Sequence, residues 1–411
     1  MLAQIVLLAS ILPFTLAKEE IIRNIVVFGD SFSDVGNNQR LTNGPVWSEH
    51  LAVGWNASLY SFAFSGAACN NDLYSSQQQN QEFIPSITDQ VEMFYDQEDL
   101  RSLDMQETVV IFWVGVNDVF KILEQQRSQD YEKVVDCIGT NIRNFRRIFS
   151  ANKFIVMGIP PLERMPFYAN TKLASSRGKA ANHLDELLTK EVEKMNKHLQ
   201  SLELDLVDVH KMLDDIVQHP AMFEIANAKD SYWDVCQGQC SDDIDSYVWW
   251  DRTHLTGGVH RLIANSILMA GSLAPETYLS DAVDVNYLLQ EPHSPYKSPI
   301  YKPKRNTGKI IRIIQKLNDE KAQEQNQKEE QQEEQQLRDL MGDDRPKTSG
   351  TTTHFVYFGL SATVIVSIAF LLFVRTKRRR NHLAALSGLL KSNNDRGRFM
   401  PLRNMDSESA V

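Results

Sequence analysis

The sequence has no excess of positive charge. Lys and Arg number 43 against 53 Asp and Glu, which gives a formal net charge of -10 at pH 7. Because binding to the phosphate backbone requires a basic surface, this balance argues against a general nucleic-acid-binding protein. The chain also shows no internal repeat of the kind that builds solenoids. With 411 residues, it is long enough for one sizeable core and additional segments.

Cysteine is scarce, and the four residues lie in the region that we assign below to an oxidising compartment. An even number of cysteines there predicts two disulfides. Proximity in the sequence favours Cys236–Cys240 and Cys69–Cys137. A metal site at the closer pair is the alternative, but no second ligand pair stands nearby with zinc spacing, so we expect neither a metal nor a cofactor. Asn56 begins an N-glycosylation sequon.

The two ends of the chain predict a route through the secretory pathway. A short apolar run ending in small residues predicts a signal peptide over residues 1–17. Residues 355–374 carry no charge and are long enough to cross a bilayer as one helix. Basic residues follow directly, so the positive-inside rule assigns residues 375–411 to the cytoplasm. We therefore expect a single-pass type I protein of the cell surface or an endomembrane, although a buried strand and a buried helix are alternatives for the two runs.

Between these ends, short apolar runs alternate with amphipathic stretches. Four apolar runs stand out and a fifth is weaker: residues 25–28, 108–114, 154–157 and 204–209, and residues 59–63. Continuous apolar strands are typical of a sheet that is covered on both faces. Alternation with helices predicts an α/β fold, a doubly wound parallel sheet flanked by helices, over residues 18–291.

Residues 292–354 have a different composition. The stretch 294–306 is rich in Pro, Lys and Tyr, which predicts a linker, and residues 319–336 contain Ala322 as their only apolar residue. A tract of Gln and Glu cannot bury a core. A solvated helix and a disordered stalk both fit it, and we favour a stalk that holds the domain away from the membrane.

Polar residues follow several predicted strands, which is where ligands of such sheets bind. The turn Gly29-Asp30-Ser31 presents the Ser31 hydroxyl at that edge of the sheet. A serine nucleophile needs a base, and the base needs an acid to orient it. His254 supplies the base, and Asp251, three residues before it, supplies the acid. Six histidines compete with His254, and each has the simpler reading of a structural or surface residue: His50, His183, His198, His210, His219 and His260.

A serine nucleophile that attacks a carbonyl also needs N–H donors for the oxygen that becomes negative. Asn117 follows the strand 108–114 and offers a side-chain amide there. Gly66 offers a backbone N–H with room for close approach, and the Ser31 N–H lies at the start of a helix. Each of these signals alone also fits an ordinary turn.

Taken together and in this order, these residues resemble the GDSL, or SGNH, hydrolase family. Four blocks carry the resemblance: FGDSFSDVGN at 28–37, SFAFSGA at 61–67, GVND at 115–118 and WDRTHLT at 250–256. Residues 43–47 and 84–91 further resemble the long-chain branch that includes fungal carbohydrate acetylesterases. Ser61, Ser65 and Leu255 depart from the usual family pattern without removing a catalytic group.

The resemblance implies an SGNH hydrolase-like three-layer sandwich and a serine ester hydrolase. It implies Ser31 as nucleophile, His254 as base, Asp251 as its orienting acid, and Ser31, Gly66 and Asn117 as oxyanion-hole donors. The expected substrate is a short-chain, for example acetyl, ester of a carbohydrate or another small polar molecule. Four tryptophans could stack on sugar rings or pack in the core: Trp47, Trp55, Trp249 and Trp250. The alternatives are a lipase or phospholipase acting on membrane lipids and a catalytically silent cell-surface binding module.

Overall fold

The computed structural model describes residues 21–74, 82–125 and 130–340. The expected signal peptide, the segment 355–374 and the tail 375–411 lie outside these residues. Among the described residues, no helix is both long and apolar enough to cross a membrane. The chain divides into two compact units after Lys316.

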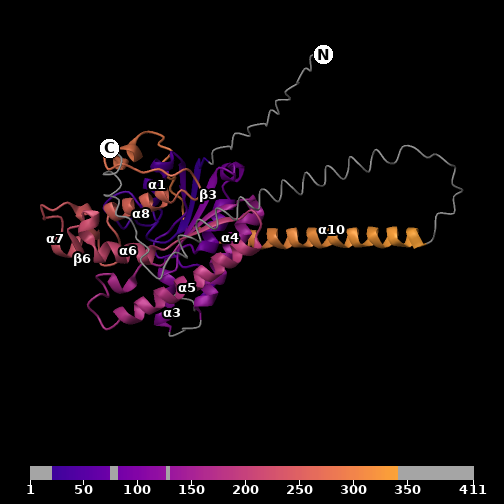
Figure 1. Cartoon of the computed structure of the whole chain (residues 1–411), viewed down its shortest axis with the longest axis horizontal. Coiled ribbons are helices and arrows are strands. Elements are labelled where there is room, and N and C mark those ends of the chain that lie inside the picture. Colours follow the sequence, from indigo (N-terminus) through magenta and orange to yellow (C-terminus); the bar gives the residue numbers. More distant parts are fainter. Residues whose placement is uncertain (1–20, 75–81, 126–129, 341–411) are drawn as a thin grey trace, which may run out of the picture. The chain divides into compact units, whose positions relative to one another are not determined.

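A five-stranded parallel sheet forms the centre of the first unit (Figure 1). The strand order is β2-β1-β3-β4-β5, and every neighbouring pair is parallel. The strands agree with the five apolar runs of the sequence: β1 (Asn24–Gly29), β2 (Ser58–Ser61), β3 (Thr108–Trp113), β4 (Lys153–Met157) and β5 (Glu203–Val207). From β1 the chain first adds β2 on one side and then returns to add β3 on the other side. A ligand site is expected at such a switch point, at the carboxyl ends of β1 and β3.

Helices cover both faces of the sheet, so the predicted doubly wound arrangement is confirmed. Figure 1 shows α1 and α8 on one face and α4 and α5 on the other. Strands β1, β3 and β4 are buried over nearly their whole length, which explains their continuous apolar sequences. The helices of this unit are α1 (Trp47–Trp55), α2 (Ile87–Tyr95), α3 (Val116–Glu124), α4 (Tyr131–Phe149), α5 (Ala174–His198), α6 (Val209–Gln218), α7 (Tyr232–Cys236), α8 (Gly257–Ala270) and α9 (Val285–Gln290).

A second, two-stranded sheet that the sequence did not predict joins β6 (Asn227–Ser231) to β7 (Tyr247–Trp249). Helix α7 lies between the two strands in sequence, and the disulfide Cys236–Cys240 closes the turn that follows it. Tyr232, Cys236 and Tyr247 form a small buried cluster there. This subdomain places the loop between β7 and α8, where Asp251 and His254 lie.

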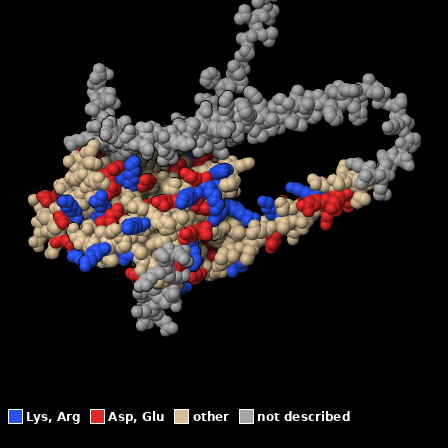
Figure 2. All heavy atoms as spheres, turned by 60° about the horizontal axis from the view of Figure 1, so that its bottom comes forward, with Lys and Arg blue, Asp and Glu red and all other residues tan. Residues whose placement is uncertain are grey.

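Residues 295–309, which the sequence predicted to be part of a linker, pack on the domain instead. Ser298 is 3% exposed, and the Tyr301 ring stacks on Phe62 with ring centroids 3.9 Å apart. The chain then enters α10 (Lys309–Leu340), which includes the Gln/Glu tract. The side chains of residues 318–337 are exposed, and Asp and Glu gather on this part of α10 (Figure 2). Of the two forms considered for the tract, the structure has the solvated helix.

Candidate active site

Ser31 lies in the turn that follows β1. At Gly29, the last residue of β1, an added Cβ would lie only 2.9 Å from the Trp113 carbonyl oxygen, so the close approach of β3 requires glycine. The Asp30 N–H donates to that carbonyl (3.2 Å), and the Asp30 carboxylate accepts the Phe32 N–H (3.1 Å). These bonds fix the turn and leave Ser31 partly exposed at the carboxyl edge of the sheet.

His254 meets Ser31 from the loop between β7 and α8. Its Nε2 lies 2.9 Å from Ser31 Oγ, and its Nδ1 lies 2.7 Å from Asp251 Oδ2. The N–H groups of Thr253 and His254 both donate to Asp251 Oδ1, at 2.7 and 2.8 Å. Although burial opposes ionisation, the hydrogen bond and charge of His254 and these two N–H groups hold the pKa of the Asp251 carboxyl below its usual range. The structure thus joins the three residues that the sequence singled out, with the acid ionised at neutral pH.

The imidazole ring has two further neighbours that the sequence did not reveal. Thr253 Oγ1 lies 3.0 Å from His254 Nδ1, and the Phe32 ring lies 5.6 Å from the imidazole, centroid to centroid. Phe32 itself is held by stacking on Trp113 at 5.1 Å. A threonine next to a histidine and a phenylalanine next to a serine carry no distinctive signal in one sequence.

Three of the competing histidines have structural roles. His50 and His260 are 3% and 2% exposed, and burial lowers the pKa of both, to about 3 for His260, so both are neutral core residues. His210 pairs with Glu163 at 3.3 Å. Within the described part of the chain, the imidazole that hydrogen-bonds Ser31 Oγ is that of His254.

The two other predicted oxyanion-hole residues follow β2 and β3, which flank β1 in the sheet. Gly66 has φ +89°, and an added Cβ would lie 2.8 Å from Ile84 Cδ1, so this position favours glycine. Asn117 Nδ2 donates to the Ala67 carbonyl oxygen (2.9 Å), which ties the two loops together. An amide nitrogen carries two N–H groups, so Asn117 can donate a second hydrogen bond.

A buried carboxylate that the sequence analysis did not single out holds the Gly66 loop. Asp34 is fully buried and accepts the Ser65 N–H at 2.7 Å. The same carboxylate accepts four further N–H groups of the loop after Ser31: those of Gly36, Asn37, Asn38 and Gln39. Asp34 therefore links the turn around Ser31 to the loop around Gly66. We call these segments the nucleophile turn and the oxyanion loop, after the predicted roles of Ser31 and Gly66. The available signal was the Asp-x-Gly-Asn pattern at the end of the first sequence block.

The segment after Gly66 is anchored by Asp118, the neighbour of Asn117. The Asp118 carboxylate accepts the Cys69 N–H (3.1 Å) and the Tyr74 hydroxyl (2.6 Å). Burial raises the pKa of this carboxyl to about 6, and the two donors oppose that rise. The disulfide Cys69–Cys137, one of the two predicted pairs, ties the same segment to α4. Asn56, the sequon residue, is exposed at the end of α1.

An open pocket lies beside Asp251. Its rim includes Trp233 and Phe167, whose exposed fractions are 54% and 51%. By contrast, Trp47 and Trp249 are fully buried and belong to the core, so the interpretation of these two as sugar platforms is wrong. The pocket is lined by Phe167, Ser231, Trp233, Asp234, Asp251, Arg252 and Thr253.

Asp30 should give the protein a measurable pH dependence. Burial raises the pKa of its carboxyl to about 8; the Phe32 N–H opposes this shift, and the charges of Asp118 and Asp34 add to it. The native state therefore keeps a proton that the unfolded chain releases near pH 3.8. Between these two values the free energy of unfolding falls as pH rises, by about 1.4 kcal/mol per pH unit from this group. We expect Asp30→Asn, which cannot ionise, to lose less unfolding free energy than wild type between about pH 5 and pH 8.

Denaturant unfolding at several pH values measures this difference. The exposed Asp72 provides a matched control, because Asp72→Asn should follow the wild-type pH dependence. Parallel curves for wild type and Asp30→Asn would contradict the assignment of a native-state proton to Asp30.

Comparison with known proteins finds a family and several relatives that this chain resembles. A family model described as GDSL-like lipase/acylhydrolase matches residues 25–267. A thermolabile hemolysin of Vibrio parahaemolyticus is 22% identical over 284 residues, which cover 60% of this chain and 63% of the hemolysin. An acetylesterase of Hypocrea jecorina is 20% identical over 307 residues, which cover 59% of this chain and 87% of that enzyme. Among solved structures, an acetylxylan esterase of Geobacillus stearothermophilus matches with 13% identity and a TM-score of 0.37, over 61% of this chain and 94% of that one.

Proposed function

We propose that this protein hydrolyses carboxylic esters with Ser31 as the nucleophile. The chain belongs to the GDSL-like lipase/acylhydrolase family, which supports this proposal. The observation that carries the proposal is the unbroken hydrogen-bonded chain from Ser31 Oγ through His254 to the Asp251 carboxylate. A serine hydroxyl is a weak nucleophile at neutral pH, and this arrangement is the one that activates it.

The reaction proceeds in two halves. Ser31 Oγ attacks the ester carbonyl carbon while its proton moves to His254 Nε2, and the Asp251 carboxylate stabilises the resulting imidazolium. The tetrahedral oxyanion accepts hydrogen bonds from the backbone N–H groups of Ser31 and Gly66 and from the side-chain N–H of Asn117. When the C–O bond breaks, His254 returns the proton to the departing alcohol and an acyl-serine remains. Water then attacks the acyl-serine with His254 as base, and this step releases the carboxylic acid and restores the Ser31 hydroxyl.

Asn117→Ala is expected to lower kcat by roughly 10²- to 10³-fold, because one donor to the oxyanion is lost. The loss should fall on kcat rather than KM, since the charge on that oxygen develops in the transition state. Asn196→Ala is a matched control, because Asn196 also donates its amide to a carbonyl, that of Leu204 at 2.7 Å, but lies on α5. An Asn117→Ala enzyme with wild-type kcat would remove this residue from the mechanism.

The proposed substrate is a short acyl ester, such as an acetyl ester, of a carbohydrate. The exposed faces of Trp233 and Phe167 support this choice, because aromatic rings offer an apolar surface to one side of a pyranose. Arg252 and Asp234, which pair at 2.7 Å on the same rim, offer charged hydrogen-bonding groups to hydroxyls. A recognition site for polar ligands needs both kinds of group.

Hydrolysis of a series of aryl esters with increasing acyl length tests this proposal on the full-length chain. We expect acetate to be the best acyl group and the rate to fall steadily with chain length. Release of acetate from an acetylated xylo-oligosaccharide should weaken with Trp233→Ala, while hydrolysis of aryl acetate stays unchanged. A preference for long acyl chains would instead favour the lipase alternative.

We also propose that the catalytic domain faces the lumen or the cell exterior and is held by a single membrane helix at residues 355–374. The two disulfides support an oxidising compartment. Protection of the domain from protease in sealed microsomes tests this topology, and cleavage without detergent would contradict it.

A further inference from the structure

The segment 295–309, which we call the strap, runs along the edge of the sheet next to the catalytic loops. Strand β2 stands at one end of the strand order, so among the described strands it is an edge strand, and its outward N–H groups need partners. The Leu59 N–H donates to the Pro295 carbonyl oxygen (2.9 Å), and the Ser61 N–H donates to Ser298 Oγ (2.8 Å). The strap therefore satisfies the edge of the strand that leads to the oxyanion loop.

Asn37 connects the strap to that loop. Its Oδ1 accepts the Tyr301 N–H (2.8 Å), and its Nδ2 donates to the carbonyl oxygens of Ser61 (2.8 Å) and Ala63 (3.0 Å). The Tyr301 ring completes this contact by stacking on Phe62. Asn37 lies in the loop that follows Ser31, and residues 61–63 lead to Gly66, so one side chain joins the strap to both of these segments.

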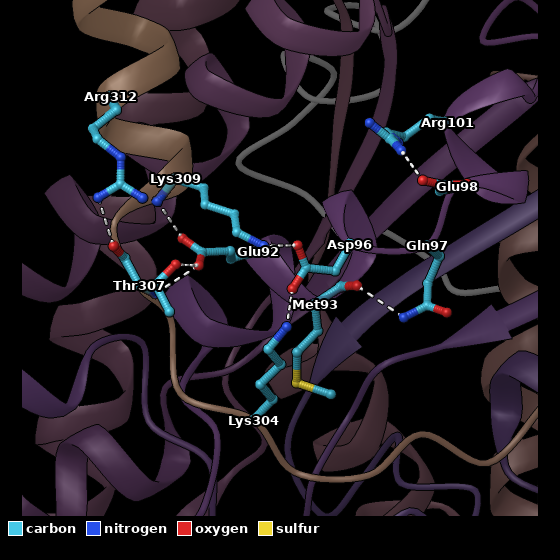
Figure 3. Close-up of polar contacts among 10 residues, drawn as sticks. All are labelled: Glu92, Met93, Asp96, Gln97, Glu98, Arg101, Lys304, Thr307, Lys309 and Arg312. Atoms are coloured by element: carbon cyan, nitrogen blue, oxygen red, sulfur yellow. Dashed lines mark hydrogen bonds and ion pairs between the residues drawn. The ribbon is translucent and has the colours of Figure 1, made fainter.

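The end of the strap binds to acidic side chains of α2 and of Asp96, the residue that follows this helix (Figure 3). Glu92 accepts the N–H and hydroxyl of Thr307 and the N–H of Lys309, and Asp96 pairs with the side chains of Lys304 and Lys309. Although burial opposes it, these two lysines hold the pKa of the Asp96 carboxyl below its usual range. The basic charge of the strap thus matches the acidic charge of α2.

Helix α2 in turn holds the strand that carries the nucleophile. Gln90, on the same helix and fully buried, accepts the Gly29 N–H and donates to the Gly29 carbonyl oxygen, both at 2.9 Å. Gly29 is two residues before Ser31. Asp89, the neighbour of Gln90, accepts both the backbone and side-chain N–H groups of Asn306 (2.8 and 2.6 Å). A second route therefore leads from the strap through α2 to the nucleophile turn.

We propose that the strap positions the nucleophile turn and the oxyanion loop for catalysis, with Tyr301 and Ser298 as positioning residues. The inference rests on the proposed ester hydrolysis. Its physical basis is that both connections end within a few residues of reacting groups, where a displacement of about 1 Å can cost on the order of 10²-fold in rate. A fragment ending at residue 291 would lack the strap and should be a poor enzyme even when folded.

The test compares full-length variants in hydrolysis of an aryl acetate. We expect Tyr301→Ala to lower kcat by roughly 10- to 100-fold with KM within about twofold of wild type. Tyr301→Phe keeps both the stacked ring and the backbone N–H and should restore kcat. Tyr296→Ala is the matched control, because Tyr296 lies on the same strap but its hydroxyl donates to Asn56 (2.7 Å), outside the catalytic loops.

The outcomes are distinct. Wild-type kcat in Tyr301→Ala, or an equal loss in Tyr296→Ala, would overturn the positioning role. If Tyr301→Ala does not fold, the smaller change Ser298→Ala decides by the same comparison of kcat with KM. It removes one hydroxyl, which accepts the Ser61 N–H and donates to the Pro299 carbonyl oxygen. An inactive wild type would overturn the proposed function itself and the inference with it.

Discussion

Ser31→Ala is expected to lower kcat by roughly 10⁶-fold, as loss of the nucleophile does in other serine hydrolases. The change deletes one oxygen at a partly exposed position and leaves the backbone bonds of the turn in place, so the fold should persist. No acyl-enzyme can form without that oxygen. Single-turnover hydrolysis of an aryl acetate and mass spectrometry of the trapped acyl-serine measure the two consequences separately.

The control for this change is a serine outside the site. Ser176 is exposed on α5, and its hydroxyl donates to the Leu173 carbonyl oxygen (2.8 Å), so Ser176→Ala should behave as wild type. Acylation at any residue other than Ser31, or wild-type turnover in Ser31→Ala, would refute the assigned nucleophile. A folded but inactive wild type would favour the binding-module alternative.

The sheet could be predicted from the sequence, and the candidate site residues could be chosen from it, for a physical reason. Parallel strands that are buried on both faces must be apolar along their whole length, so β1, β3 and β4 can be recognised as short continuous runs. The carboxyl ends of such strands lie together at one edge, which brings Ser31 and Asn117 to the same edge of the sheet. His254 was recognisable because Asp251 stands three residues before it and because both lie in the block 250–256 that resembles the family.

The strap could not be predicted because its contacts are distant in sequence and polar in character. Its composition of Pro, Lys and Tyr is also that of a linker, and no periodicity distinguishes the two. What holds it is the pairing of Lys304 and Lys309 with Asp96, more than 200 positions earlier, and the stacking of Tyr301 on Phe62. These residue pairs can be identified only in the folded structure, where the strap lies beside α2 and β2.

The roles of the tryptophans also could not be assigned from the sequence alone. Trp47 and Trp249 could be assigned either to the core or to a sugar platform from sequence, and both prove to be fully buried. The exposed Trp233 was not singled out, because its place beside Asp251 depends on the small β6–β7 sheet. Strand β7 is apolar but has only three residues, and β6 is largely polar, so this sheet leaves little trace in the sequence.

Asp251→Asn should lower kcat by about 10⁴-fold while the fold stays intact. The amide oxygen of asparagine can still accept the Thr253 and His254 N–H groups that Asp251 Oδ1 accepts at 2.7 and 2.8 Å. Its NH₂ group, however, would face His254 Nδ1 and donate to it. The imidazole would then carry its proton on Nε2, which points at Ser31 Oγ, and a protonated nitrogen cannot accept the hydroxyl proton.

The variant therefore separates orientation of the base from binding of the substrate. We expect the loss in kcat with KM close to wild type, measured by steady-state hydrolysis of an aryl acetate. Asp214→Asn is the matched control, because Asp214 is a carboxylate that also pairs with an arginine, Arg164 (2.7 Å), but lies outside the site. A rate for Asp251→Asn equal to that of Asp214→Asn would mean that His254 needs no acid to hold its tautomer. The Asp251 carboxylate would then be a structural cap for the Thr253 and His254 N–H groups, and the catalytic unit would be reduced to Ser31 and His254.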